Sequence, residues 1–192
     1  MKISDKQSDK RKAIMDASLK LFCEKCFQDT STASISQAAN VGTGTLFCYF
    51  SSKEELVNAL YLEAKEELAA FVAEGVWEQN TFKARLKHIF ERRIAWYRAN
   101  REKIKFMGQY HSSSLITKIT REKALLSSNA LNEVVIKALE DGEVHSHSAD
   151  LFTALISGYV HQSALYVAEN APEADLNKWQ DEAFQVLWKG VS

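Results

Sequence analysis

The 192-residue chain has few of the residues that interrupt helices or crosslink a fold. One proline and seven glycines leave few places to break a helix. Three cysteines, Cys23, Cys26 and Cys48, are too few and odd in number for a secreted disulfide framework, so we expect free thiols in a reducing compartment. No segment approaches the roughly 20 apolar residues that span a bilayer, and the N-terminus lacks the apolar core of a signal peptide. We expect a cytoplasmic protein without a membrane partner.

Charge of one sign is also scarce, since the formal net charge is only -1. The distribution is uneven, however. Residues 1–53 carry eight Lys or Arg against five Asp or Glu, a net charge of +3, and the remainder carries -4. A basic N-terminal part is compatible with nucleic-acid binding. The same lysines and arginines would also serve as a solvated tail, and both interpretations stay open.

Apolar residues recur at helical spacing along the chain, and no strand-like alternation or hairpin signal is present. The fold class is therefore predicted to be all-α. Helices are expected over residues 10–25, from 32 to about 39, over 43–50 and from the capping box Ser52–Glu55 to about residue 75. Later helices are expected over 115–140, 148–169 and 175–189. We expect an N-terminal domain over residues 1–53 and a second domain over 54–192, linked by helix 54–75.

The most informative segment is 31–56. It predicts two short helices joined by a tight turn at Asn40–Gly42, followed at once by the capped start of a longer helix. That order is typical of a DNA-reading helix-turn-helix, whose second helix lies in the major groove.

From Arg11 to about Phe71 the chain closely resembles the TetR family of bacterial transcriptional regulators. The matching positions keep the family's spacing: Ile14, Ala17, Leu21, Phe22, Phe27, Thr30, Ser31, Ile35, Ala38, Ala39, Val41, Gly44, Thr45, Leu46, Phe47, Tyr49, Phe50, Ser52, Lys53, Glu54 and Leu56. The resemblance implies an N-terminal three-helix helix-turn-helix DNA-binding domain and a C-terminal helical ligand-binding and dimerisation domain. It also implies a homodimer formed largely by the last two helices.

The resemblance also assigns DNA-binding roles to particular residues. It places Thr43, Gly44, Thr45 and Cys48 toward the bases, and Thr30 or Ser31, Tyr49 and Lys53 near phosphates. Threonine can offer its hydroxyl and its methyl to base edges, and glycine lets the backbone approach the DNA closely. This base-facing set is uncharged and lacks an arginine fork for guanine, so we expect an operator rich in A·T near the contacted bases.

Four positions depart from the family pattern. Cys26 and Asn40 stand where glycine is common, and a left-handed backbone at a residue such as Cys26 would cost about 1–2 kcal/mol. Asn tolerates that conformation better. Phe47 replaces a frequent tyrosine and cannot donate to a phosphate, and Cys48 replaces a more usual basic or polar residue.

By resemblance, a mainly apolar effector pocket lies in the C-terminal domain. Its candidate lining residues are aromatic, or polar beside aromatic ones: Trp96, Tyr97, Phe106, Met107, Tyr110, His111, Tyr159, His161, Gln162 and Tyr166. Such a stripe is also compatible with an ordinary core. The dimer is expected to use small and apolar residues of the last two helices: Ala154, Gly158, Leu165, Trp179, Ala183, Val186 and Leu187. Packing within one subunit is the alternative.

Other chemistry finds little support. The Cys23–Cys26 spacing suggests metal or redox chemistry but has no second pair or nearby His, and the His145–His147 spacing falls in an expected exposed loop, so we predict no metal and no cofactor. Redox sensing by the base-facing Cys48 or by the Cys23–Cys26 pair stays open as an alternative. Phosphate loops and catalytic triads are not recognisable, which argues against an enzyme. We expect a ligand-responsive repressor that binds a double-stranded, palindromic operator. The alternative is a helical adaptor or ligand-binding protein of the same fold that does not act through DNA.

Overall fold

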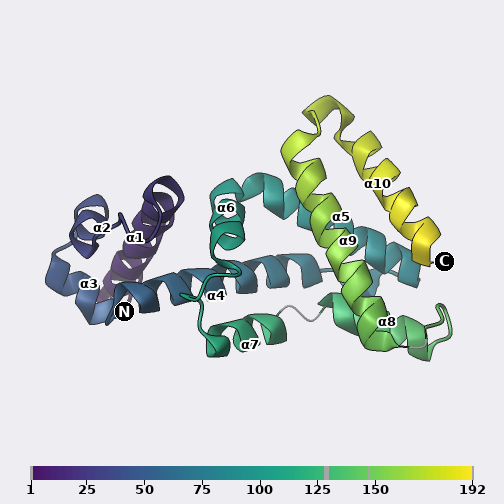
Figure 1. Ribbon diagram of the computed structural model, residues 1–192, viewed down its shortest axis with the longest axis horizontal. Helices are drawn as coiled ribbons and strands as arrows, with labels where there is room; N and C mark the ends of the chain where they lie inside the picture. The colour runs from purple at the N-terminus through teal and green to yellow at the C-terminus, as the bar shows by residue number, and fades with distance from the viewer. Residues whose placement is uncertain (1, 128–129, 147, 192) are drawn as a thin grey trace. The chain divides into compact units, whose positions relative to one another are not determined.

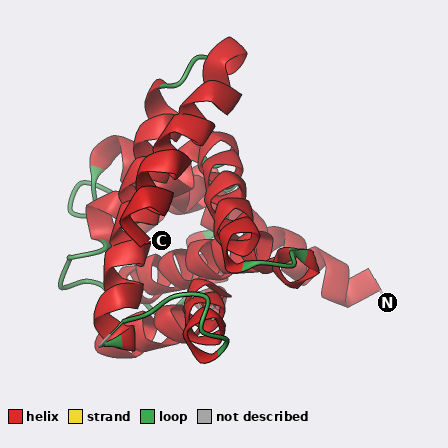
Figure 2. Ribbon diagram, turned by 90° about the vertical axis from the view of Figure 1, so that its right-hand side faces the viewer, coloured by secondary structure: helices red, strands yellow, loops and turns green. Residues whose placement is uncertain are grey.

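The computed structural model describes residues 2–127, 130–146 and 148–191. These residues form helices and connecting turns without a strand, which confirms the all-α prediction (Figure 2). The elements are α1 (Lys2–Lys25), α2 (Thr32–Ala38), α3 (Thr43–Tyr49), α4 (Lys53–Ala73), η1 (Val76–Glu78), α5 (Phe82–Ala99), α6 (Arg101–Tyr110), α7 (Lys118–Ser127), α8 (Ala130–Glu140), α9 (Ala149–Asn170), η2 (Glu173–Asp175) and α10 (Leu176–Val191). None of the helices within the described ranges is both long and apolar enough to cross a bilayer.

The chain divides into two compact units. The first consists of Met1–Ala64 and Arg101–Ala124, and the second of Lys65–Asn100 and Leu125–Ser192. We call them the head unit and the C-terminal unit. In the head unit, α1 packs against α2, α3 and α6. Each unit therefore combines segments that are distant in the sequence.

Phe22 is the centre of the head-unit core. Its ring is fully buried and lies 6.0–6.3 Å, centroid to centroid, from the rings of Phe27, Phe106 and Tyr110. The Cys23 thiol also reaches α6, where it donates to the carbonyl of Glu102 at 3.3 Å. The aromatic residues of α6 thus share one core with α1 and Phe27.

Local chemistry sets the turns as the sequence predicts. Cys26 and Asn40 both adopt left-handed backbone conformations, with φ of 64° and 53°. Ser52 and Glu55 form the predicted capping arrangement, since the Ser52 hydroxyl accepts the Glu55 N–H at 3.0 Å. The Glu55 carboxylate accepts both the N–H and the hydroxyl of Ser51, and these bonds hold the Glu55 pKa below its ordinary value. The start of α4 is therefore fixed from within its own sequence.

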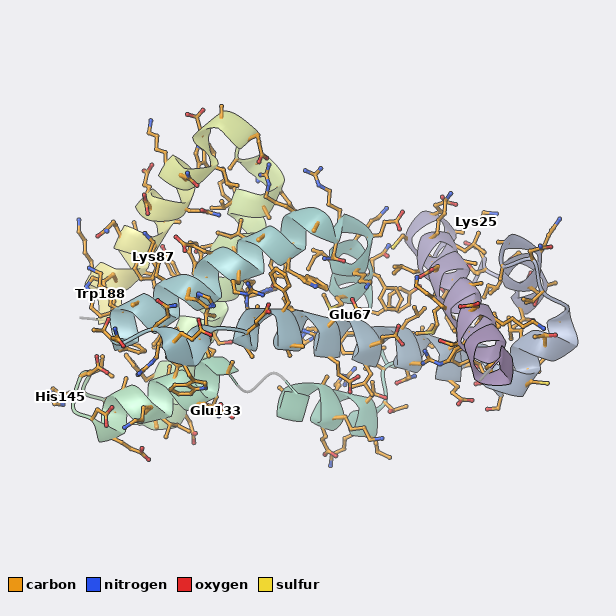
Figure 3. The ribbon with its side chains drawn as sticks, turned by 180° about the vertical axis from the view of Figure 1, so that it is seen from behind. Lys25, Glu67, Lys87, Glu133, His145 and Trp188 are labelled. Carbon is orange, nitrogen blue, oxygen red and sulfur yellow. The ribbon has the colours of Figure 1, made fainter. Side chains whose placement is uncertain are left out.

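The C-terminal unit is built around α5, which packs against α8, α9 and α10. Figure 1 shows α9 and α10 as an antiparallel pair joined by a tight connection at η2. Contacts between α5 and α10 include an ion pair of Lys87 with Asp181 at 2.8 Å and the rings of Phe82 and Trp188, which lie 6.0 Å apart. Lys87 and Trp188 are labelled on these neighbouring helices in Figure 3.

Two helix starts differ from the sequence prediction. Helix α1 begins at Lys2 rather than near Lys10, so the basic N-terminal stretch is helical. The helix expected from Leu115 begins at Lys118, because the Thr117 hydroxyl accepts the Thr120 N–H and Asn58 of α4 binds the backbone of Leu115 and Thr117. Within the expected helix 115–140 the structure describes α7 and α8, and residues 128 and 129 lie outside the described ranges.

Candidate functional site

The candidate DNA-reading surface is formed by α2, the following turn and α3. The Ser31 hydroxyl caps α2 by accepting the Ser34 N–H at 3.0 Å. The left-handed Asn40 reverses the chain, and the Val41 N–H bonds back to the Ser36 carbonyl at 2.9 Å. Helix α3 then starts after Gly42 and buries Leu46, so its opposite face remains exposed.

The exposed face of α3 contains the residues predicted to face the bases. Thr43, Gly44 and Cys48 are exposed, and Thr45 is half-buried. A Cβ added at Gly44 would meet nothing within 4 Å, so the chain's own packing does not require glycine there. Phe47 was not predicted to face outward, but its side chain is 47% exposed beside this face. The exposed face of α3 therefore presents both polar and apolar side chains, and none of them is charged.

Two predicted phosphate contacts have other roles in the structure. Thr30 is fully buried, and its hydroxyl donates to the Cys26 carbonyl at 2.7 Å, so of the alternatives Thr30 and Ser31 only Ser31 is exposed. Lys53 donates to the carbonyls of Phe27 at 2.6 Å and of Thr30 at 2.8 Å, and its ammonium lies 4.0 Å from the Phe27 ring centroid. The expected phosphate contact at Thr30 is therefore corrected, because its buried hydroxyl is bonded to a backbone carbonyl of its own chain. Tyr49 remains half-buried at the surface.

These contacts predict that Lys53 positions the reading helices more than it binds phosphate. We expect Lys53→Met to lower the free energy of unfolding by about 1–3 kcal/mol, because two charge-assisted hydrogen bonds are lost. The slope of log affinity against log salt for DNA binding should change little, since a lost phosphate contact would reduce it by about 0.9. Lys25→Met, at an exposed position of α1, is the matched control. Unchanged stability with a reduced slope would show that Lys53 is a phosphate ligand.

The predicted effector residues fall into separate groups. Phe106 and Tyr110 belong to the head-unit core, where burial raises the Tyr110 pKa to about 12. Met107 is buried on the same helix. His111 forms a 2.8 Å hydrogen bond with Tyr61, whose pKa is raised by burial. These four residues therefore belong to the head unit.

Three effector candidates of the C-terminal unit lie together. Buried Trp96 and Tyr97 are neighbours on α5, and the Tyr97 hydroxyl lies 2.7 Å from His161 Nδ1 on α9. Two of the remaining candidates of α9 have other partners. Tyr159 donates its hydroxyl to the Ala183 carbonyl of α10, and Tyr166 stacks on Trp179 at 6.1 Å. His161, Gln162 and Tyr166 are all exposed. Among the described candidates of the C-terminal unit, Trp96, Tyr97 and His161 form one group.

Two cations beside this group were not among the predicted site residues: Lys65 of α4 and Arg93 of α5. Both side chains are half-buried. Lys65 lies next to the buried Ala64 and Arg93 next to the buried Ile94, so each flanks the apolar stripe of its helix. A basic residue at the edge of an apolar stripe is the signal that could have identified them.

The predicted dimer residues mostly lie on one exposed face of α9 and α10. Ala154, Gly158 and Val186 are exposed, and Leu165, Trp179 and Ala183 are partly exposed. The large apolar residues Leu151, Leu155 and Tyr166 of α9 are at least 58% exposed. The expected interface role of Leu187 is corrected, because its side chain is 3% exposed and packs within its own chain. A face of this kind is typical of a protein interface.

The thiol and histidine motifs remain separate from these surfaces. Burial raises the pKa of Cys23, which lowers its thiolate population, whereas Cys26 and Cys48 are exposed free thiols. His145 is exposed, and its predicted partner His147 lies outside the described residues. Among the residues that the structure describes, no group of three His, Cys, Asp or Glu side chains is placed to hold a metal ion.

Comparisons with known proteins agree with this geometry. Residues 14–60 match the family described as bacterial regulatory proteins, tetR family. A structure from Shewanella sp. PV-4, assigned to the tetR family of transcription regulators, superposes with a TM-score of 0.83 at 26% identity and covers 95% of this chain and 97% of its own.

Two further similarities concern regulators of fatty acid metabolism. The fatty acid metabolism regulator protein of Bacillus subtilis is 18% identical over 191 residues, 93% of each chain. The structure of the transcriptional regulator FadR from Bacillus subtilis in complex with stearoyl-CoA has a TM-score of 0.76 at 20% identity, with 94% of this chain and 98% of that chain covered. At such identity the structural likeness establishes a shared fold.

Proposed function

Because the chain belongs to the TetR family of bacterial regulatory proteins, we propose that it is a repressor that binds double-stranded DNA and is released by a small-molecule effector. The observation that carries this proposal is the exposed, uncharged face of α3, held on the buried Leu46 within the segment that matches the family. Thr43, Thr45 and Cys48 offer hydroxyl, methyl and thiol groups to base edges, and Gly44 allows close backbone approach. Ser31 and Tyr49 are the proposed phosphate contacts, with Phe47 as an added apolar contact.

A homodimer is the proposed functional unit, because two copies of α3 would then occupy successive major grooves about 34–36 Å apart on a palindromic operator. The exposed face of α9 and α10 is the proposed interface. On α9, its residues recur at helical spacing and exclude the buried side of the helix. Two such faces would form a four-helix contact. We keep residues 1–53 as the DNA-binding domain, residues 54–192 as the effector and dimer domain, and a cytoplasmic location as parts of the same proposal.

Gly158 provides a test of this interface. A Cβ at Gly158 would meet nothing within 4 Å in its own chain. Glycine within a helix also costs about 1 kcal/mol relative to alanine, so packing within the chain gives no reason for glycine at this position. We expect Gly158→Gln to weaken dimerisation at least tenfold in sedimentation experiments while helical content is kept. Gly108→Gln is the matched control, since Gly108 also lies within a helix with nothing within 4 Å. Equal dimer affinity of the two variants would contradict the proposed interface.

The proposed effector is mainly apolar, in agreement with the fatty acid metabolism regulator and the stearoyl-CoA complex among the similar proteins. Trp96, Tyr97 and His161 are the proposed contacts. Effector binding would favour a conformation in which the two reading helices of the dimer no longer match the groove repeat. By linkage, operator DNA must weaken effector affinity by the same factor.

Salt dependence distinguishes this function from that of an adaptor that binds protein. Phosphate contacts release counterions, so affinity for a duplex should fall steeply between about 50 and 200 mM salt. The slope of log affinity against log salt should be roughly proportional to the number of phosphate contacts. Fluorescence anisotropy of labelled duplex DNA measures that slope. Absent or salt-insensitive binding would support the adaptor and reject the regulator.

A further inference from the structure

Two basic side chains of the C-terminal unit are half-buried at the edge of the apolar stripes of their helices. Lys65 lies between the buried Ala64 and Leu68 on α4, and Arg93 lies next to the buried Ile94 on α5. Both helices also have fully exposed positions, such as Glu66 on α4 and Ala95 on α5, where a charged side chain would meet water. Their placement therefore needs a reason other than solubility.

The electrostatics of these side chains are unfavourable in the structure as it stands. Burial lowers the pKa of Lys65, and the nearby positive charge of Arg93 lowers it further. The Nε atom of Arg93 is buried and, within the described ranges, has no hydrogen-bond partner. A buried donor without a partner costs about 1–3 kcal/mol, and more when it carries charge. An anion beside Arg93 would supply the acceptor that its Nε lacks, and would favour the charged form of the neighbouring Lys65.

The groups around Arg93 favour an anion with an apolar body. Tyr97 is buried, which raises its pKa, and the Arg93 charge acts on it in the opposite direction. Its hydroxyl lies 2.7 Å from His161 Nδ1, and when that nitrogen carries the proton and donates, the Tyr97 hydroxyl is free to donate to a bound oxygen. The ring of Trp96 lies 6.2 Å from that of Tyr97 and is itself buried. Cations and a hydroxyl thus lie beside aromatic rings.

We propose that Lys65, Arg93 and Tyr97 bind the carboxylate of the effector, whose apolar part packs beside Trp96. This inference rests on the proposed function, because it assumes that the C-terminal unit binds an effector, and it names the effector's class as a monocarboxylic acid. A carboxylate is compact and planar, and matches the guanidinium fork of arginine. The multiply charged, strongly hydrated phosphates of a coenzyme A thioester would be harder to bury at two partly enclosed cations.

Tryptophan fluorescence can test this assignment with saturated acids of 8 to 16 carbons and the alcohols of the same length. All four tryptophans lie in the C-terminal unit. We expect the unmodified protein to bind the preferred acid at least tenfold more tightly than its alcohol. Arg93→Gln should lose that preference and keep its affinity for the alcohol. Lys65→Met should reduce the preference, and Arg101→Gln, the same substitution at an exposed position, should retain it.

Thermal unfolding shows whether each variant is folded, so that a loss of binding is not mistaken for a loss of structure. Without ligand, Arg93→Gln should unfold at a similar temperature, because losing the buried Nε donor that has no partner offsets losing the hydrogen bond between Arg93 and Tyr97. The acid should raise the melting temperature of the unmodified protein but not that of Arg93→Gln. Equal binding of acids and alcohols at every length, or an acid preference unchanged in Arg93→Gln, would overturn the proposal. Tight binding of the thioesters without binding of the free acids would overturn it too.

Duplex DNA binding by the same preparations separates this inference from the proposed function. DNA binding without an acid preference would reject the carboxylate site and leave the regulator intact. An acid preference that depends on Arg93, in a protein that does not bind DNA, would support the carboxylate site and reject the regulator.

Discussion

Thr43→Glu is expected to abolish specific DNA binding, with an affinity loss of at least 100-fold, while the protein stays folded. Thr43 is exposed at the first position of α3, so a carboxylate there would meet the negative field of the DNA. Like charges in an interface cost several kcal/mol, and about 2.7 kcal/mol already corresponds to 100-fold. A carboxylate in the first turn also favours the helix dipole, so folding should not suffer.

Anisotropy with operator DNA and far-UV circular dichroism measure the two effects separately. Gln109→Glu is the matched control, because it adds the same charge at an exposed position of α6. It should lower affinity only slightly through net charge. A Thr43→Glu protein that binds as well as the control would exclude α3 as the reading helix.

Phe22→Ala should produce the largest loss of stability, about 3–5 kcal/mol. Phe22 is fully buried and contacts the rings of α6 as well as Phe27, so its removal leaves a cavity between α1 and α6. Circular dichroism should show early unfolding of the head unit. Tryptophan fluorescence should shift less, because all four tryptophans lie in the C-terminal unit.

The matched control is Phe47→Ala, in the same unit but at a side chain that is 47% exposed. A surface substitution of this kind should change the free energy of unfolding by no more than about 0.5 kcal/mol. If both phenylalanine variants lost equal stability, the aromatic cluster around Phe22 would not be the centre of the head-unit core.

Local rules explain why the reading helices could be predicted from the sequence. The capping pair Ser52 and Glu55, and the left-handed backbone at Cys26 and Asn40, depend on residues within a few positions of each other. The start of α7 could not be predicted, because it depends on Asn58, which is 59 residues from Thr117 in the sequence. Long-range partners of that kind leave no periodic signal.

Which element covers the inner face of a helix could not be predicted from the sequence. Apolar periodicity shows that a helix has an inner face, but not its partner. Phe106 and Tyr110 pack on Phe22 of α1 in the head-unit core, and Leu187 is buried within its own chain. The half-buried Arg93 lies at the edge of the apolar stripe of α5, where periodicity alone does not separate inner from outer positions.

The most direct test of the central claim is selection of bound duplexes from random-sequence DNA by the purified protein. We predict enrichment of a palindrome whose half-sites are centred about one helical turn apart, or a multiple of it, and are rich in A·T where α3 contacts the bases. Thr43→Glu should enrich nothing. Failure of the unmodified protein to enrich any sequence would contradict the DNA-binding function, and a G-rich consensus would contradict the readout by the uncharged face of α3.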